Sequence, residues 1–94
     1  MKYQILQIKD WENSSYLFSG WSWAKKFFNL KDYQVMYEGE IEETNTKNAL
    51  EAIFVKFNVN PPRDFRGSSL SVSDVIKLGT KYYFVDNVDF VEVK

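Results

Sequence analysis

The chain lacks cysteine and histidine altogether, and it has only two prolines and four glycines in 94 residues. Without these side chains it cannot form disulfides, Cys/His metal sites, or Ser-His and Cys-His catalytic arrangements. No hydrophobic run approaches the roughly 18 residues of a membrane span. Residues 1–5 show no apolar leader. We therefore expect a cytoplasmic protein with no membrane contact, no metal and no cofactor.

The residues that are present indicate one folded domain over residues 1–94. Hydrophobic residues make up 45% of the chain and aromatic residues 18%. A chain of this length without disulfides or bound metal ions needs bulky side chains for its core. The net charge is −1, which argues against a general nucleic-acid binder.

Hydrophobic periodicity predicts an α+β fold, with a mainly antiparallel sheet of about five short strands and two helices. Alternation and turn residues place strands at 2–9, 33–41, 75–78, 81–85 and 90–93. Helical spacing of apolar residues places helices at 20–29 and 48–58.

Three of these elements carry specific expectations. The second helix should begin at Asn48, which resembles an N-cap because Glu51 follows three residues later. The first helix contains Gly20, which weakens it. The strand at 33–41 should place alternate side chains on one buried face. Those side chains are Tyr33, Val35 and Tyr37.

The segment 11–28 holds seven aromatic residues, more than one face of a single helix can bury. Exposed tryptophan and phenylalanine often mark a partner surface, whereas a small core that needs bulk would bury them all. Our candidate partner-binding aromatics are Trp11, Phe18, Trp21, Trp23 and Phe27.

Acidic residues gather around the end of the strand at 33–41. They could steer the chain toward a basic protein surface, or they could be no more than a solvated turn. These candidates are Glu38, Glu40, Glu42 and Glu43.

Two other functions remain open. A nucleic-acid-associated accessory domain would use basic residues with stacking aromatics. Its candidates are Lys25, Lys26, Lys31, Arg63 and Arg66. An enzyme would need carboxylate chemistry at Asp74 or Asp86, and a buried carboxylate with a raised pKa in a cleft would favour it. The simpler interpretation of Ser73 and Asp74 is that they bond backbone N–H groups and fix a turn.

Several motifs resemble the YodL-like domain family. Residues 65–76 read FRGSSLSVSDVI, and residues 82–90 read YYFVDNVDF. Residues 32–37 (DYQVMY) and 50–54 (LEAIF) match its strand and helix motifs upstream. The motif resemblance covers about residues 26–93 and leaves 10–25 outside.

The resemblance implies a setting rather than a reaction. Such domains occur in proteins of phages, plasmids and conjugative elements, and the resemblance carries no catalytic activity. Ser68 stands where the family usually has histidine. We therefore expect a non-enzymatic accessory protein of a mobile element that binds a host or element protein with a basic surface. A host defence component of the CRISPR or restriction type is the specific expectation.

Overall fold

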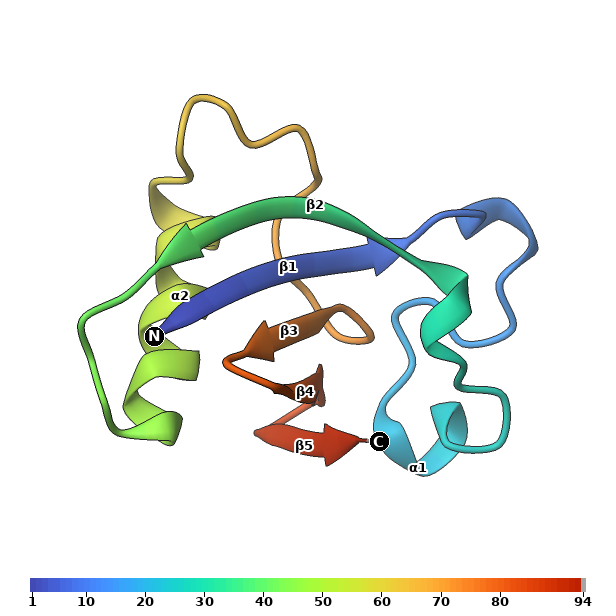
Figure 1. Cartoon of the computed structure of the whole chain (residues 1–94). Coiled ribbons are helices and arrows are strands. Elements are labelled where there is room, and N and C mark those ends of the chain that lie inside the picture. The colour runs from blue at the N-terminus through green and yellow to red at the C-terminus, as the bar shows by residue number, and fades with distance from the viewer. Residues whose placement is uncertain (94) are drawn as a thin grey trace.

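The strands form a single antiparallel sheet with the order β2-β1-β3-β4-β5 (Figure 1). The computed structural model describes residues 1–93. The strands are β1 (Lys2–Ile8), β2 (Tyr33–Glu40), β3 (Val75–Leu78), β4 (Lys81–Val85) and β5 (Phe90–Val93). The helices are α1 (Trp21–Ala24) and α2 (Thr46–Val59), with 3₁₀ turns at Trp11–Asn13 and Leu30–Asp32. The predicted α+β class is confirmed.

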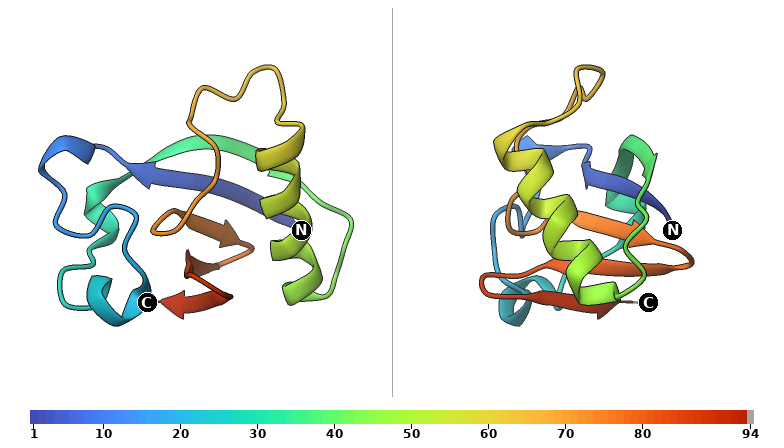
Figure 2. Two further views of the ribbon diagram at one scale, coloured as in Figure 1. Left: turned by 180° about the vertical axis from the view of Figure 1, so that it is seen from behind. Right: turned by 90° about the vertical axis from the view of Figure 1, so that its left-hand side faces the viewer.

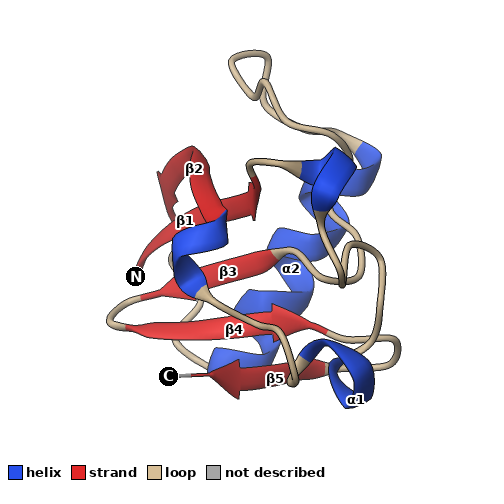
Figure 3. Cartoon of the chain, turned by 90° about the vertical axis from the view of Figure 1, so that its right-hand side faces the viewer, coloured by secondary structure: helices blue, strands red, loops and turns tan. Residues whose placement is uncertain are grey.

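Both faces of the sheet are covered, each by a different part of the chain. One face packs against α2, whose buried side chains Leu50, Ile53 and Phe57 meet Ile5 and Ile76 of the sheet. Figure 3 shows α2 behind β3 and β4. The opposite face packs against the connection between β1 and β2, residues 9–32, called the β1–β2 connection below. The buried or half-buried side chains of this second cluster are Leu6, Ile8, Tyr16, Leu17, Trp21, Ala24, Phe28, Leu30, Tyr33, Val75, Tyr82, Phe84, Val91 and Val93.

Helix α2 confirms its predicted apolar stripe but begins earlier than expected. The N-cap is Asn45, whose side-chain oxygen accepts a hydrogen bond from the backbone N–H of Asn48 at 3.0 Å. Asn48, the predicted cap, therefore lies inside the first turn. The polar run before the helix offers several cap residues, and the sequence alone does not choose among them.

Strand β2 differs from its predicted alternation because of a β-bulge. Ile5 pairs with Tyr37 and Leu6 pairs with Val35, so Met36 is the extra residue. A bulge reverses the side-chain alternation beyond it. Tyr37 consequently packs on the α2 face and Tyr33 on the other face. The predicted burial of Val35 is wrong, since this side chain is 49% exposed.

Helix α1 is much shorter than the predicted 20–29 and spans Trp21–Ala24. The predicted apolar stripe still packs inward, because Ala24 is buried and Trp21 and Phe28 lie half-buried against Phe84. The chain closes back on itself after one turn, with the N–H groups of Phe27 and Phe28 both donating to the Ala24 carbonyl. Gly20 and tertiary contacts thus override the helical pattern.

The connection from α2 to β3 passes over β1 and β2 on the α2 side of the sheet (Figure 2). The hydrogen bond from Gln7 Nε2 to the Ser68 carbonyl, at 3.0 Å, fixes it there. Within residues 1–93, none of the helices has the length and apolarity to cross a bilayer.

Candidate functional site

Four of the five predicted aromatic residues are exposed, and all four belong to the β1–β2 connection. Trp11 is 63% exposed, Phe18 66%, Trp23 49% and Phe27 44%. We call these four side chains the aromatic end. Apolar side chains this large are usually buried, so their exposure on one connection is the feature that needs explanation.

Trp21 does not belong to this exposed set. Its ring lies 5.0 Å from the Phe84 ring and 5.3 Å from the Phe28 ring, measured between centroids. Its backbone N–H donates to Asp86 Oδ1 at 2.9 Å. Trp21 therefore fastens the connection to the sheet. This packing does not support the prediction that Trp21 contacts a partner.

Trp23 and Phe27 form a pair on the surface. Their ring centroids are 5.5 Å apart, and Lys26 Nζ lies 4.9 Å from the Trp23 ring centroid. The indole N–H of Trp23 donates to the Ser15 carbonyl at 3.0 Å. The pair is thus held in one arrangement while both rings stay accessible, as a preorganised contact surface requires.

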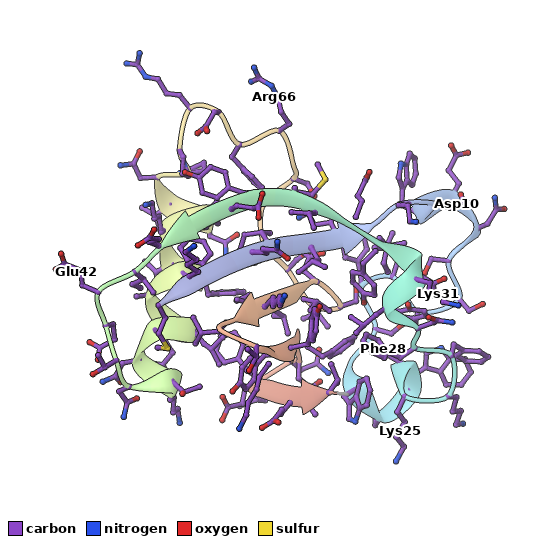
Figure 4. All side chains as sticks on the ribbon, viewed as in Figure 1. Asp10, Lys25, Phe28, Lys31, Glu42 and Arg66 are labelled. Carbon is purple, nitrogen blue, oxygen red and sulfur yellow. The ribbon has the colours of Figure 1, made fainter. Side chains whose placement is uncertain are left out.

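The acidic candidates lie at the other end of the molecule. Glu38 and Glu40 pair with Gln4 and Lys2 at the start of β1, whereas Trp11 follows the end of that strand. The seven residues of β1 span about 20 Å at the usual strand rise. Figure 4 shows Glu42 on the opposite side of the molecule from Lys31 and Phe28. The aromatic and acidic candidates therefore form two separate surfaces.

The basic residues of the nucleic-acid alternative are also not brought together. Lys25 and Lys31 lie by the β1–β2 connection, while Arg66 projects from the loop between α2 and β3, well apart from them (Figure 4). A nucleic-acid groove needs a continuous basic track along the backbone of its ligand. The arrangement of these three residues offers none.

A cavity of about 550 Å³ lies beside the aromatic end, where β1 and β2 meet the loop before β3. We call it the Asp74 cavity. Trp11 and Phe18 line it from the β1–β2 connection, and Gln34 and Met36 line it from β2. Its other lining residues are Gln7, Ile8, Lys9, Leu17, Arg66, Gly67, Ser68 and Asp74.

Asp74 is 4% exposed and is the one carboxylate among the residues that line this cavity. Its Oδ2 accepts hydrogen bonds from the Ser71 backbone N–H at 2.8 Å and from Gln7 Nε2 at 3.1 Å. Burial raises the pKa of Asp74 to about 7, and the two hydrogen bonds limit the rise. The predicted turn is confirmed, since Asp74 and Ser73 both accept from backbone N–H groups.

Two residues beside the cavity hold an unusual backbone conformation. Phe18 has φ of 63° and Ser73 has φ of 82°. The Phe18 N–H donates to Ser73 Oγ at 2.9 Å, so each supports the other. Positive φ costs about 1–2 kcal/mol for residues with a side chain. A bulky residue held this way with its ring in solvent gains little packing in return, which points to function.

Two buried tyrosines, Tyr16 and Tyr33, make hydrogen bonds near Phe18 and Ser73. The Tyr33 hydroxyl donates to the Ser73 carbonyl, and the Tyr16 hydroxyl donates to Asp32 Oδ2 at 2.7 Å. Burial raises both tyrosine pKa values, with that of Tyr16 reaching about 12. Both hydroxyls therefore stay protonated and keep donating at neutral pH.

Asp74 meets the condition set for the carboxylate alternative, because it is buried, has a raised pKa and lines a cavity. General acid–base chemistry at a pair of carboxylates needs a second carboxyl group, and the cavity lining contains none. Asp86 instead uses Oδ1 as a cap, accepting from the N–H groups of Trp21 and Asn87. Among residues 1–93, no cluster of carboxylates could hold a metal ion.

The sequence does not predict the cavity, although Phe18 and Asp74 were candidate site residues. Gln7, Phe18, Gly67 and Asp74 are far apart in the chain, and only the fold brings them together. The Ser-x-Ser-Asp run at residues 71–74 was the available signal. It indicated a turn, and a turn carries no information about a cavity beside it.

Comparison with known proteins identifies the family. The family model of the YodL-like domain matches residues 2–94. The chain belongs to the YodL-like domain family. The matched range includes residues 10–25, which lie outside the motif resemblance described above. The β1–β2 connection is therefore part of the family domain.

A viral protein is among the relatives of this YodL-like domain. It is an uncharacterized protein, R785, of Acanthamoeba polyphaga mimivirus, 34% identical over 79 residues. The alignment covers 70% of this chain and 73% of the relative. No solved structure matches the chain.

Proposed function

We propose that this YodL-like domain is a non-enzymatic accessory protein of a virus or mobile element that binds a host or element protein through its aromatic end. One observation carries the proposal. The β1–β2 connection packs Trp21 and Phe28 inward while leaving Trp11, Phe18, Trp23 and Phe27 in water. The segment buries the aromatics that its core needs and displays four more.

The arrangement of charge supports a protein partner with a basic surface. Exposed carboxylates at the far end of β2 attract such a surface over a range of about 8–10 Å at physiological salt. Because they lie a strand length away from the aromatic end, they contribute only where the partner is large enough to reach both surfaces, whereas the aromatic side chains provide the lasting contact. These carboxylates belong to Glu38, Glu40, Glu42 and Glu43.

The family and the viral relative support a setting in a virus or mobile element. In its specific form the proposal names a component of a host defence system, of the CRISPR or restriction type, as the partner. A cytoplasmic location belongs to the same proposal.

The experiment is capture of partners by the tagged full chain from host cells, with and without nuclease. Three chains are compared: the wild type, a variant with Trp11→Ala, Trp23→Ala and Phe27→Ala, and a variant with all four glutamates changed to glutamine. We expect the wild type to capture a stoichiometric protein that survives nuclease. The aromatic variant should not capture it. The glutamine variant should capture it with a weaker dependence on salt concentration. Equal capture by the wild type and the aromatic variant would contradict the proposal.

A further inference from the structure

The floor of the Asp74 cavity presents hydrogen-bond acceptors without matching donors. Gln7 Nε2 donates to both Ser68 O and Asp74 Oδ2, which fixes the orientation of the amide. No hydrogen bond within residues 1–93 reaches Gln7 Oε1 or Asp74 Oδ1. Because no fully buried side-chain oxygen or nitrogen in this range lacks a partner, both oxygens are open to the cavity. Its floor therefore suits a group with several N–H donors.

Gly67 makes room for this floor. A Cβ on Gly67 would lie 2.3 Å from Gln7 Oε1 and 2.7 Å from the Phe65 ring. A side chain at this position would displace the Gln7 amide, which in turn holds Asp74. The position of the two acceptors, Gln7 Oε1 and Asp74 Oδ1, thus depends on the absence of a side chain at residue 67.

The walls of the cavity add aromatic faces. Trp11 and Phe18 line it and are more than 60% exposed, at 63% and 66%. Aromatic faces attract cations, and the flat guanidinium group stacks on them while its fork of donors engages a carboxylate. A lysine ammonium would offer three donors but no plane to stack.

We propose that the Asp74 cavity receives an arginine side chain of the partner protein, with its guanidinium bonded to Asp74 and Gln7 and covered by Trp11 and Phe18. The inference rests on the proposed function, since it names the group of the partner that the aromatic end recognises. The guanidinium would supply the cation that buried Asp74 lacks among its own hydrogen-bond partners, Gln7 and the Ser71 N–H. The strained backbone of Phe18 keeps one wall in place.

Two basic residues also line the cavity, and their positive charges could oppose the binding of a cation. Lys9 and Arg66 are exposed, and Arg66 points away from the sheet into solvent (Figure 4). Charges in water are screened, whereas a buried carboxylate interacts in a lower dielectric. Asp74 therefore dominates at the floor, and the two cations act at the mouth.

The test is a titration of the isotope-labelled full chain with N-acetyl-arginine methylamide, followed by amide chemical shifts. The matched probe is the citrulline analogue, which has the same shape but no charge. We expect saturable shifts at Gln7, Phe18 and Gly67 with arginine, and at least tenfold weaker binding of citrulline. Asp74→Asn should weaken arginine binding by a similar factor, whereas Val59→Ala, which changes an exposed side chain of α2 outside the cavity, should leave it unchanged.

Several outcomes of these experiments would contradict an arginine site in the cavity. Absence of saturable shifts with arginine, or equal binding of citrulline, would overturn the inference. Shifts with inorganic phosphate centred on Lys9 and Arg66, and none with arginine, would show an anion site instead. Because the probe is a defined small molecule, this outcome is separate from that of partner capture. A chain that captures a protein equally well with Asp74→Asn would refute the cavity while leaving the proposed function intact.

Discussion

The two covers of the sheet are built in different ways. Helix α2 buries a regular stripe of apolar side chains and is capped by Asn45. The β1–β2 connection has one helical turn and two 3₁₀ turns, and side-chain hydrogen bonds fasten it to distant strands and loops. The aromatic residues of the helix, Phe54 and Phe57, pack against the core, whereas the connection completes the core and also displays aromatic side chains. This difference is the reason for proposing the connection, and not the helix, as the binding surface.

The largest effect on stability should come from the helix side. Phe57 is 1% exposed and contacts Tyr3, Tyr37 and Phe65 edge to face. Phe57→Ala should lower the free energy of unfolding by about 3–5 kcal/mol, because it leaves a cavity in the core. Urea denaturation measures this loss. Trp23→Ala is the matched change on the connection, and a loss of similar size there would break the comparison.

Asp74 should make stability depend on pH. Its pKa of about 7 in the folded chain exceeds the ordinary value of 3.8. Between these values the folded chain keeps a proton that the unfolded chain has lost. The free energy of unfolding therefore falls as pH rises from about 4 to about 7, by at most about 4 kcal/mol at 1.36 kcal/mol per pKa unit.

The control for this prediction is Asp74→Asn, which has no proton to release. Denaturation at several pH values should show a shallower fall for the variant than for the wild type over the same window. Parallel curves for the two proteins would show that Asp74 is not the group responsible.

The attachment of the connection to the sheet should be weaker than the core. Asp86→Ala removes the acceptor of the Trp21 N–H. We expect a loss of about 1–2 kcal/mol, typical of a lost cap, with faster hydrogen exchange at Trp21–Ala24 and unchanged exchange in α2. Glu42→Ala, at an exposed position in the polar connection after β2, is the control. Uniformly faster exchange in α2 would show that the two covers are one cooperative unit.

The smallest effect should have the opposite sign. Phe18→Gly relieves the positive φ at this position and removes a ring that is 66% exposed. The free energy of unfolding should stay unchanged or rise by up to about 1 kcal/mol, while arginine binding falls. A loss above about 1 kcal/mol in denaturation would assign Phe18 to the core.

The parts that the sequence predicts well are those governed by local pattern. The strands at 75–78, 81–85 and 90–93 were predicted with the observed bounds, because alternation and the Gly79-Thr80 turn define them. The buried stripe of α2 follows from its period. The predicted stripe of the first helix includes Trp21, which is half-buried against Phe84, whereas the exposure of Trp23 on the adjacent stripe did not follow from the pattern.

The parts that escape prediction depend on distant contacts. The bulge at Met36 is set by pairing with β1, and it places Tyr37 on the opposite face of the sheet from Tyr33. The Asp74 cavity joins Gln7 to Asp74, two residues 67 positions apart in the chain. Neither feature has a local signature, since each is created when separate segments meet.

We propose that the aromatic end is a binding surface and not a part of the core. The most direct measurement determines partner capture and the free energy of unfolding together for the variant with Trp11→Ala, Trp23→Ala and Phe27→Ala. We predict stability within about 1 kcal/mol of the wild type, as for exposed positions in general, and loss of capture. A variant that loses several kcal/mol, or one that captures the partner as the wild type does, would contradict this claim.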